Sequence, residues 1–70
     1  MMPLCYAEIG TPQIIKRIGG DPETKKHLED LGFHIGGEIR VINTIGGNLI
    51  VNVKECRVAL SRGLANKIMI

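Results

Sequence analysis

The side chains best suited to chemistry in this sequence are two histidines and the carboxylates near them. His27 follows Glu23 by four residues and precedes Asp30 by three, and His34 follows Asp30 by four. On a helix, positions three and four apart are neighbours, so Glu23, His27 and Asp30 would lie near one another. His34 comes just past the expected end of the helix. A transition-metal site needs three or four converging ligands, and this spacing matches no standard pattern. We predict no dedicated metal site; His27, His34 and Asp30 are the metal-ligand candidates, and a solvated helix face accounts for the same residues.

Other reactive side chains show no catalytic pattern. Cys5 and Cys56 are far apart and form no CxxC pair, which predicts two reduced thiols, each a small buried apolar residue. Ser61 has no GxSxG context. The glycine pairs at 19–20, 36–37 and 46–47 match no phosphate-binding motif and occur where turns are expected. We therefore predict that the chain is not an enzyme and needs no cofactor.

The segment from Asp21 to Phe33 predicts one short helix. Asp21 is suited to the N-cap, and Pro22 to the first helical position, where a missing N–H costs nothing. Gly32 is suited to the left-handed residue after the helix. That position would bring Phe33 into contact with Leu28 in a Schellman motif. A helix of this length is marginal alone in water, so it must pack against the rest of the chain.

The remainder of the chain has the alternation and the β-branched residues of short strands. Ile39, Val41 and Ile45 are predicted to face inward from one strand, and Val58 and Leu60 from another. Residues 46–48 (Gly-Gly-Asn) predict a hairpin, and a second tight turn is expected near Glu55. Residues 2–9 are predicted to form an extended edge or an irregular segment that covers the core. Residues 61–67 are predicted to form a turn with a single helical turn in it. The predicted strands are Thr11–Ile18, Glu38–Ile45, Leu49–Lys54, Cys56–Leu60 and Ile68–Ile70.

Length and composition complete the fold prediction. Seventy residues allow one domain, and 44% hydrophobic with 23% charged residues is ordinary globular composition. No apolar run approaches the roughly 18 residues that a membrane span requires, and we expect a cytoplasmic protein without direct membrane insertion. Short strands with β-branched residues on their inner faces bury these residues best when the sheet curls into a barrel. We predict a mainly β fold: a small SH3-like five-stranded β-barrel with one short helix inserted after the first strand.

Binding to nucleic acid or to proline-rich peptides is not favoured. Both uses of a small barrel depend on aromatic platforms, and Tyr6 and Phe33 are the only aromatic residues. The nine basic residues are scattered, and the net charge is only +2. What remains is a set of apolar residues out of phase with the core, which predicts a protein-binding surface if they are contiguous. These partner-binding candidates are Ile42, Ile50, Met69, Tyr6 and Leu64.

Two segments of the sequence resemble the FeoA family of small cytoplasmic proteins of bacterial ferrous iron uptake. The more specific is "LEDLGFHIGGEIRV" (residues 28–41), and "RVALSRGLANKIMI" (residues 57–70) matches independently in the same order. The resemblance implies an SH3-like barrel and an accessory role beside the membrane permease FeoB. One departure is Glu55, where the family often carries glycine. A turn that required positive φ there would be strained.

The function expected from this resemblance is that of an accessory protein that binds and modulates a FeoB-type ferrous iron permease through protein–protein contact. The partner would be the cytoplasmic region of the permease. A ferrous-iron carrier or sensor using His27 and His34 is the alternative, with weak Fe²⁺ binding as its consequence. An RNA-associated barrel is a further, weaker alternative.

Overall fold

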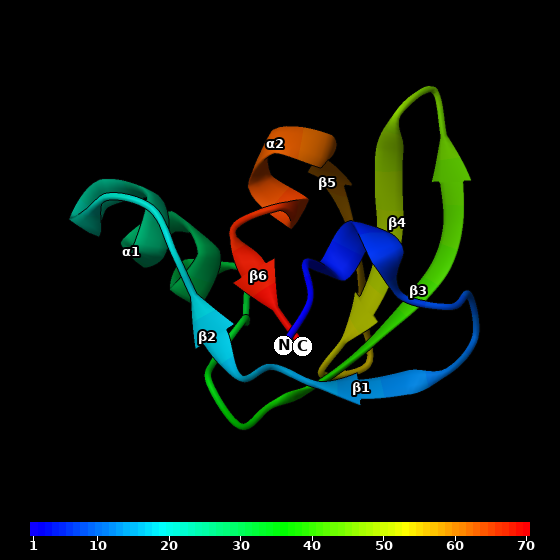
Figure 1. The fold of residues 1–70 in the computed structure, drawn as a ribbon, viewed down its shortest axis with the longest axis horizontal. Helices are drawn as coiled ribbons and strands as arrows, with labels where there is room; N and C mark the ends of the chain where they lie inside the picture. The colour runs from blue at the N-terminus through cyan, green and yellow to red at the C-terminus, as the bar shows by residue number, and fades with distance from the viewer.

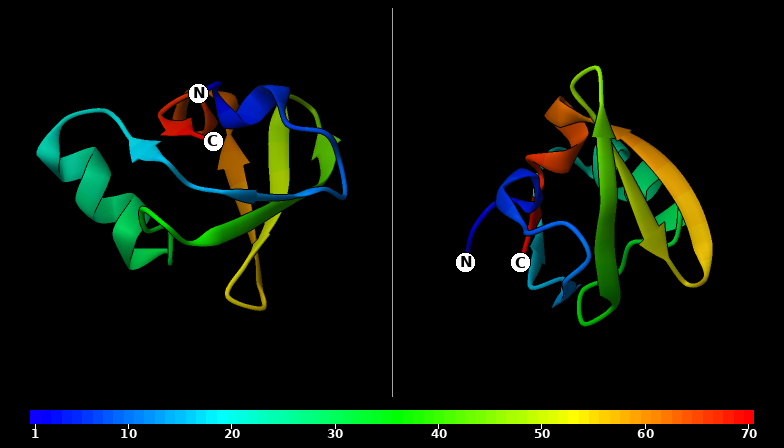
Figure 2. Two further views of the ribbon diagram at one scale, coloured as in Figure 1. Left: turned by 60° about the horizontal axis from the view of Figure 1, so that its bottom comes forward. Right: turned by 90° about the vertical axis from the view of Figure 1, so that its right-hand side faces the viewer.

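Six short strands form two small antiparallel sheets in the computed structural model, which describes all 70 residues. The elements in chain order are η1 (Leu4–Tyr6, a 3₁₀ turn), β1 (Pro12–Ile14), β2 (Arg17–Ile18), α1 (Pro22–Asp30), β3 (Glu38–Ile45), β4 (Asn48–Val53), β5 (Cys56–Ser61), α2 (Arg62–Ala65) and β6 (Ile68–Met69). One sheet has the order β1-β3-β4-β5, and the other pairs β2 with β6. The sheets do not join into a closed cylinder. They enclose one core between them, with α1 projecting to one side (Figures 1 and 2).

The predicted first strand, Thr11–Ile18, is divided between the two sheets. β1 pairs with β3, whereas β2 pairs with β6. Ile15 lies at the corner: it is fully buried, its N–H donates to the Gly37 carbonyl (2.9 Å), and its own carbonyl accepts from Gly36 N–H (2.7 Å). The next residue bonds to the other sheet, since the Lys16 N–H donates to the Met69 carbonyl (2.8 Å). The prediction of one continuous strand was therefore wrong, because the chain passes from one sheet to the other between Ile15 and Lys16. The five predicted strands become six segments in this way.

Helix α1 ends as its sequence predicts. The Thr24 N–H donates to Asp21 Oδ1 (2.8 Å), so Asp21 is the N-cap. Gly32 has φ +107°, and its N–H donates to the Glu29 carbonyl (2.9 Å). The Phe33 N–H donates to the Leu28 carbonyl (3.0 Å), which completes a Schellman motif. The helix therefore has both caps that its sequence requires.

A β-bulge in β3 changes which residues face the core. The β3–β4 register passes from Val41 opposite Val51 to Asn43 opposite Ile50, so Ile42 is the additional residue. Beyond the bulge Thr44 lies opposite the buried Leu49, and Ile45 is 61% exposed. The prediction that Ile45 faces inward was wrong, because one inserted residue reverses a period-two pattern.

Two-residue turns close both hairpins of the larger sheet. Gly46 and Gly47 join β3 to β4 with φ of +56° and +85°. Lys54 and Glu55 join β4 to β5 with φ of +49° and +64°, the signature of a type I′ turn built without glycine. The β4–β5 register is regular along its whole length. The strain that the sequence indicated at Glu55 is therefore present, and it leaves the pairing undisturbed.

The two ends of the chain lie together. The Met2 N–H donates to the Ile70 carbonyl (3.0 Å), and the Ile70 N–H donates to the Met2 carbonyl (2.9 Å). The N-terminal segment contains the η1 turn, whose Leu4 is fully buried, so this lead-in contributes to the core as well as covering it. Near the C-terminal end, Ser61 Oγ accepts from the Leu64 N–H (3.3 Å) and caps α2, the helical turn expected within residues 61–67.

The core is almost entirely aliphatic. It contains 14 buried residues, and no polar or charged residue is among them. Phe33 is the only aromatic member, and it joins α1 to the sheets. The members are Leu4, Ile15, Ile18, Leu28, Phe33, Ile39, Val41, Leu49, Val51, Val53, Leu60, Ala65, Ile68 and Ile70.

Candidate protein-interaction surface

The outer face of the larger sheet carries the first two of the partner-binding candidates. Ile42 occupies the bulge, and Ile50 lies opposite Asn43 beside it. Both are half-buried, while the flanking Val41, Leu49 and Val51 point into the core. Ile42 and Ile50 are therefore brought together, as the hairpin predicts. The bulge also turns Ile45 to this side.

Basic side chains flank these apolar residues on the same face. The sheet register places Arg40 opposite Asn52, and Asn52 opposite Arg57, in one transverse row. Side chains that alternate with the buried row point outward, and both arginines are exposed. None of the side-chain hydrogen bonds in the structure involves either guanidinium. This row could not be predicted from the sequence, because only the register of three strands places Arg40 and Arg57 on one face.

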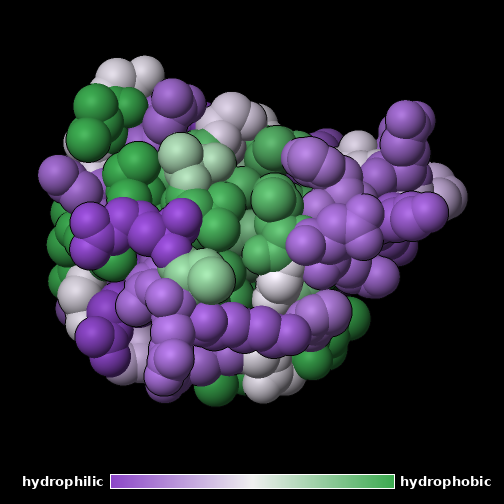
Figure 3. All heavy atoms as spheres, turned by 180° about the vertical axis from the view of Figure 1, so that it is seen from behind, coloured by the Kyte–Doolittle hydropathy of each residue, from purple (hydrophilic) through white to green (hydrophobic).

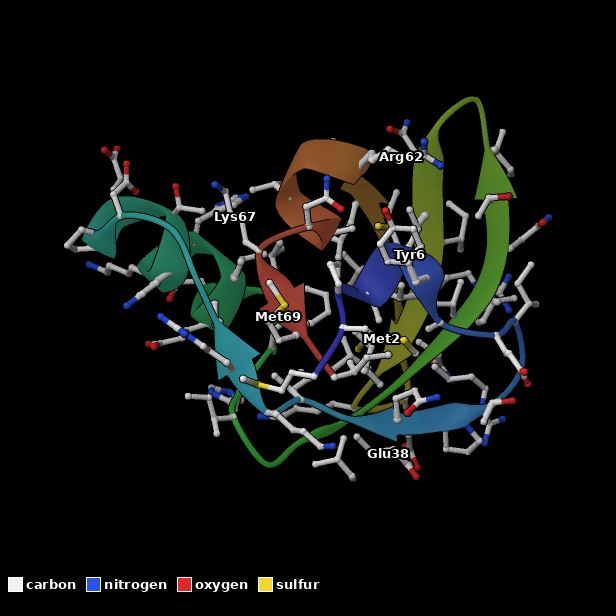
Figure 4. The ribbon with its side chains drawn as sticks, viewed as in Figure 1. Met2, Tyr6, Glu38, Arg62, Lys67 and Met69 are labelled. Atoms are coloured by element: carbon white, nitrogen blue, oxygen red, sulfur yellow. The ribbon has the colours of Figure 1, made fainter.

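The other partner-binding candidates lie elsewhere. Tyr6 is 72% exposed on η1, and Met69 is half-buried on β6. Met69 is bridged to Pro3, which places it beside the N-terminal segment and Met2 (Figure 4). Leu64 on α2 is half-buried and packs against the core. The five candidates therefore divide among the sheet face, the η1–β6 side and α2, and do not form one surface.

A shallow hollow separates α1 from α2. It has a volume of about 360 Å³ and is lined by Glu23, Thr24, His27 and Leu64. Glu23 and His27 lie one helical turn apart in it. Asp30 and His34 are also exposed. No group of three or more His, Cys, Asp or Glu side chains is placed to hold a metal ion. The structure therefore does not gather His27, His34 and Asp30 into one site.

The two cysteines differ in their surroundings. Cys5 is half-buried, and its Sγ donates to Asn66 Oδ1 (2.7 Å). Cys56 begins β5 and is exposed, so the prediction that it is a small buried apolar residue was wrong. It lies on the inward side of β5, but β5 is the last strand of its sheet, and nothing covers its first residue. The thiols are free of one another.

One titratable group is clearly perturbed. The backbone hydrogen bond from Thr24 lowers the pKa of Asp21, and the Thr24 hydroxyl hydrogen bond lowers it further. Both bonds stabilise the charged carboxylate at the positive end of α1. This perturbation belongs to helix capping and not to catalysis. No helix of the structure is long and apolar enough to cross a membrane.

The fold defines a class of protein, the SH3-like small β domains. A solved FeoA from Stenotrophomonas maltophilia, complexed with zinc and described as a prokaryotic SH3 domain protein, superimposes with a TM-score of 0.83 at 25% identity. The match covers 99% of this chain and 88% of that one. A crystal structure of an iron uptake regulatory protein, FeoA, superimposes with a TM-score of 0.88 at 29% identity, covering 97% and 90% of the two chains. The predicted SH3-like fold is thereby confirmed.

The FeoA domain model matches residues 2–70. An Fe(2+) transport protein A of Methanocaldococcus jannaschii is 36% identical over 70 residues, which is all of this chain and 85% of the relative. The chain belongs to the FeoA family, as its sequence resemblance indicates. This is an iron-transport accessory family and not a known enzyme family.

Proposed function

We propose that this protein is a cytoplasmic accessory factor of ferrous iron uptake, which binds the cytoplasmic region of a FeoB-type permease and modulates transport by protein–protein contact. The observation that carries the proposal is the family match over nearly the whole chain. The structure supports a binding role because Ile42 and Ile50 form an apolar pair on the outer sheet face, beside a row that carries the exposed Arg40 and Arg57. Apolar surface rimmed by charge is typical of interaction sites.

The test is a titration of fluorescently labelled protein with the isolated cytoplasmic domain of the permease and, separately, with the full-length transporter. Saturable binding to either supports the proposal. An Ile50→Ser variant should weaken the binding, whereas Ile35→Ser, at an exposed isoleucine outside the strands of the sheet, serves as the matched control. No saturable binding to either partner would refute the proposal.

An anaerobic Fe²⁺ titration, followed through the imidazole NMR signals, tests the carrier alternative. Shifts at His27 and His34 that saturate at one equivalent would favour a carrier, whereas the proposed function expects none.

A further inference from the structure

The two edges of the larger sheet are built differently. β1, at one edge, has three residues and begins with Pro12, which has no N–H to donate. β5, at the other edge, has six residues, no proline and no bulge. Natural proteins protect sheet edges with short strands, prolines and bulges, because an open edge is a template for another strand. β1 has such protection and β5 lacks it.

The hydrogen-bond phase of β5 identifies the groups that remain free. Val53 and Cys56 flank the two-residue turn, so they form a hydrogen-bonded pair. Such pairs alternate along an antiparallel ladder, which makes Arg57 and Ala59 non-bonded positions towards β4. Their N–H and C=O groups therefore point away from the sheet. No backbone hydrogen bond outside the ladders and helices involves residues 56–61.

The surface beside this edge is apolar on its inner side. Val58 is half-buried on β5, and Leu31 and Leu64, from the end of α1 and from α2, pack against the same core. Figure 3, seen from behind, shows hydrophobic surface across the centre of this face, with the hydrophilic side of α1 beyond it. The hollow between α1 and α2 adjoins Leu64.

The outer side of the same edge carries one basic side chain, the exposed Arg57. Arg57 ends the row that begins at Arg40, and the next strand position beyond Arg57 is vacant. Arg57 is the only charged residue of β5, and the turn before it carries one basic and one acidic residue, Lys54 and Glu55. Antiparallel pairing of β5 with β5 of a second copy would bring two Arg57 side chains together on one face in the registers that set Arg57 opposite Arg57 or Ala59 of the other copy, and like charges at such positions destabilise a sheet. Charge complementarity therefore favours an acidic strand over a second copy.

We propose that β5 is a docking edge that accepts an extended segment of a partner protein as a fifth strand of the larger sheet, with acidic and apolar side chains alternating along that segment. This proposal rests on the proposed function and specifies the surface that performs it. The acidic residues of the segment lie beside Arg57 on the outer face. Its apolar residues lie beside Val58 and extend towards Leu31 and Leu64. Main-chain hydrogen bonds supply affinity, and the alternation supplies specificity.

A peptide experiment tests the edge without the permease. Labelled peptide of alternating glutamate and valine should bind the full chain saturably, and a lysine–valine peptide should not. N-methylation of the peptide residues that face β5 should abolish binding, whereas N-methylation of the intervening residues should not. No binding of the glutamate–valine peptide, or equal binding of both N-methyl series, would overturn the proposal. Concentration-dependent dimerisation through β5 without peptide binding would overturn it in favour of a second copy.

Variants then connect the edge to the permease. Ala59→Pro removes one outward N–H and keeps the β4–β5 ladder, whereas Ala59→Val keeps that N–H. Arg57→Glu reverses the charge and should allow the lysine–valine peptide to bind. We expect Ala59→Pro and Arg57→Glu to lower affinity for the permease domain about tenfold or more, and Ala59→Val to leave it nearly unchanged. If the wild-type protein binds the permease domain and all three variants bind it equally, β5 is not the docking edge, and the proposed function is not contradicted. If the wild type binds the peptide but not the permease domain, the proposed function is refuted, while the proposal that β5 accepts an added strand is supported.

Discussion

The backbone N–H of Phe33 donates to the carbonyl of Leu28 at 3.0 Å, and both side chains are fully buried. This one relationship ends α1 and fixes the helix to the core. It depends on Gly32, which lies between them in the left-handed region with φ +107°. Short helices gain most of their stability from such tertiary packing. Predictions about the fold therefore begin here.

Leu28→Ala should be strongly destabilising. Leu28 is the only buried residue of α1, and truncation of a buried leucine costs about 2–5 kcal/mol. Urea unfolding followed by circular dichroism measures this cost, with Lys25→Ala on the exposed helix surface as the control. Equal midpoints for Leu28→Ala and the parent would show that α1 is not packed on the core.

Gly32→Ala should cost on the order of 1 kcal/mol, because an L-residue is strained in the left-handed region. A Cβ at this position would lie 3.8 Å from Lys54 Cδ, an ordinary contact, so strain and not collision sets the cost. Gly63→Ala is the matched control. Gly63 lies in α2 with open space around its Cβ position, and alanine there should raise stability slightly. Thermal melts of both variants should shift in opposite directions, and a shared direction would contradict the assigned caps.

Glu55→Gly should raise the free energy of unfolding by about 0.5–1 kcal/mol. Glu55 has φ +64°, where glycine avoids the cost of left-handed strain, although glycine also increases the entropy of the unfolded chain. Chemical denaturation measures the gain. Loss of stability in this variant would show that the Glu55 side chain contributes more than its backbone strain costs.

The stability of the protein should depend on Asp21 in the acid range. Because the pKa of Asp21 is lower in the folded state than in the unfolded chain, its charged form favours folding above the ordinary aspartate pKa, about 3.9. That contribution is lost as the pH falls through the folded-state pKa. Asp21→Asn still caps the helix but cannot titrate. The melting temperatures of the parent and this variant should therefore converge as the pH falls from 5 to 2, and a constant difference would contradict the capping role.

Local sequence signals predicted the helix and most of the strands. The pairing register between distant strands determined which of their side chains face the core. The caps at Asp21 and Gly32 were predictable because each acts within a few residues. The division after Ile15 was not, because it depends on partners that come later in the chain: Ile15 bonds to Gly36 and Gly37, whereas Lys16 bonds to Met69. The bulge at Ile42 could not be predicted from alternation either, since Ile45 fits the inward phase of Ile39 and Val41, and Ile42 alone is out of phase.

The interaction surface could be predicted only in part from the sequence, for the same reason. Ile42 and Ile50 were identified from their phase, and the hairpin between them placed them together. Tyr6, Met69 and Leu64 were chosen by the same criterion, but distant strands and helices carry them to different sides. The row from Arg40 to Arg57 and the open edge of β5 exist only in the assembled sheet.

The central claim is that this protein acts by binding another protein through its larger sheet. The most direct test is a proton–nitrogen NMR map of the labelled protein as the cytoplasmic domain of the permease is added. We predict saturable shifts centred on the amides of Ile50, Arg57 and Ala59, with His27 and His34 unchanged. A spectrum that stays the same at saturating excess of the domain, and with full-length permease, would contradict the claim.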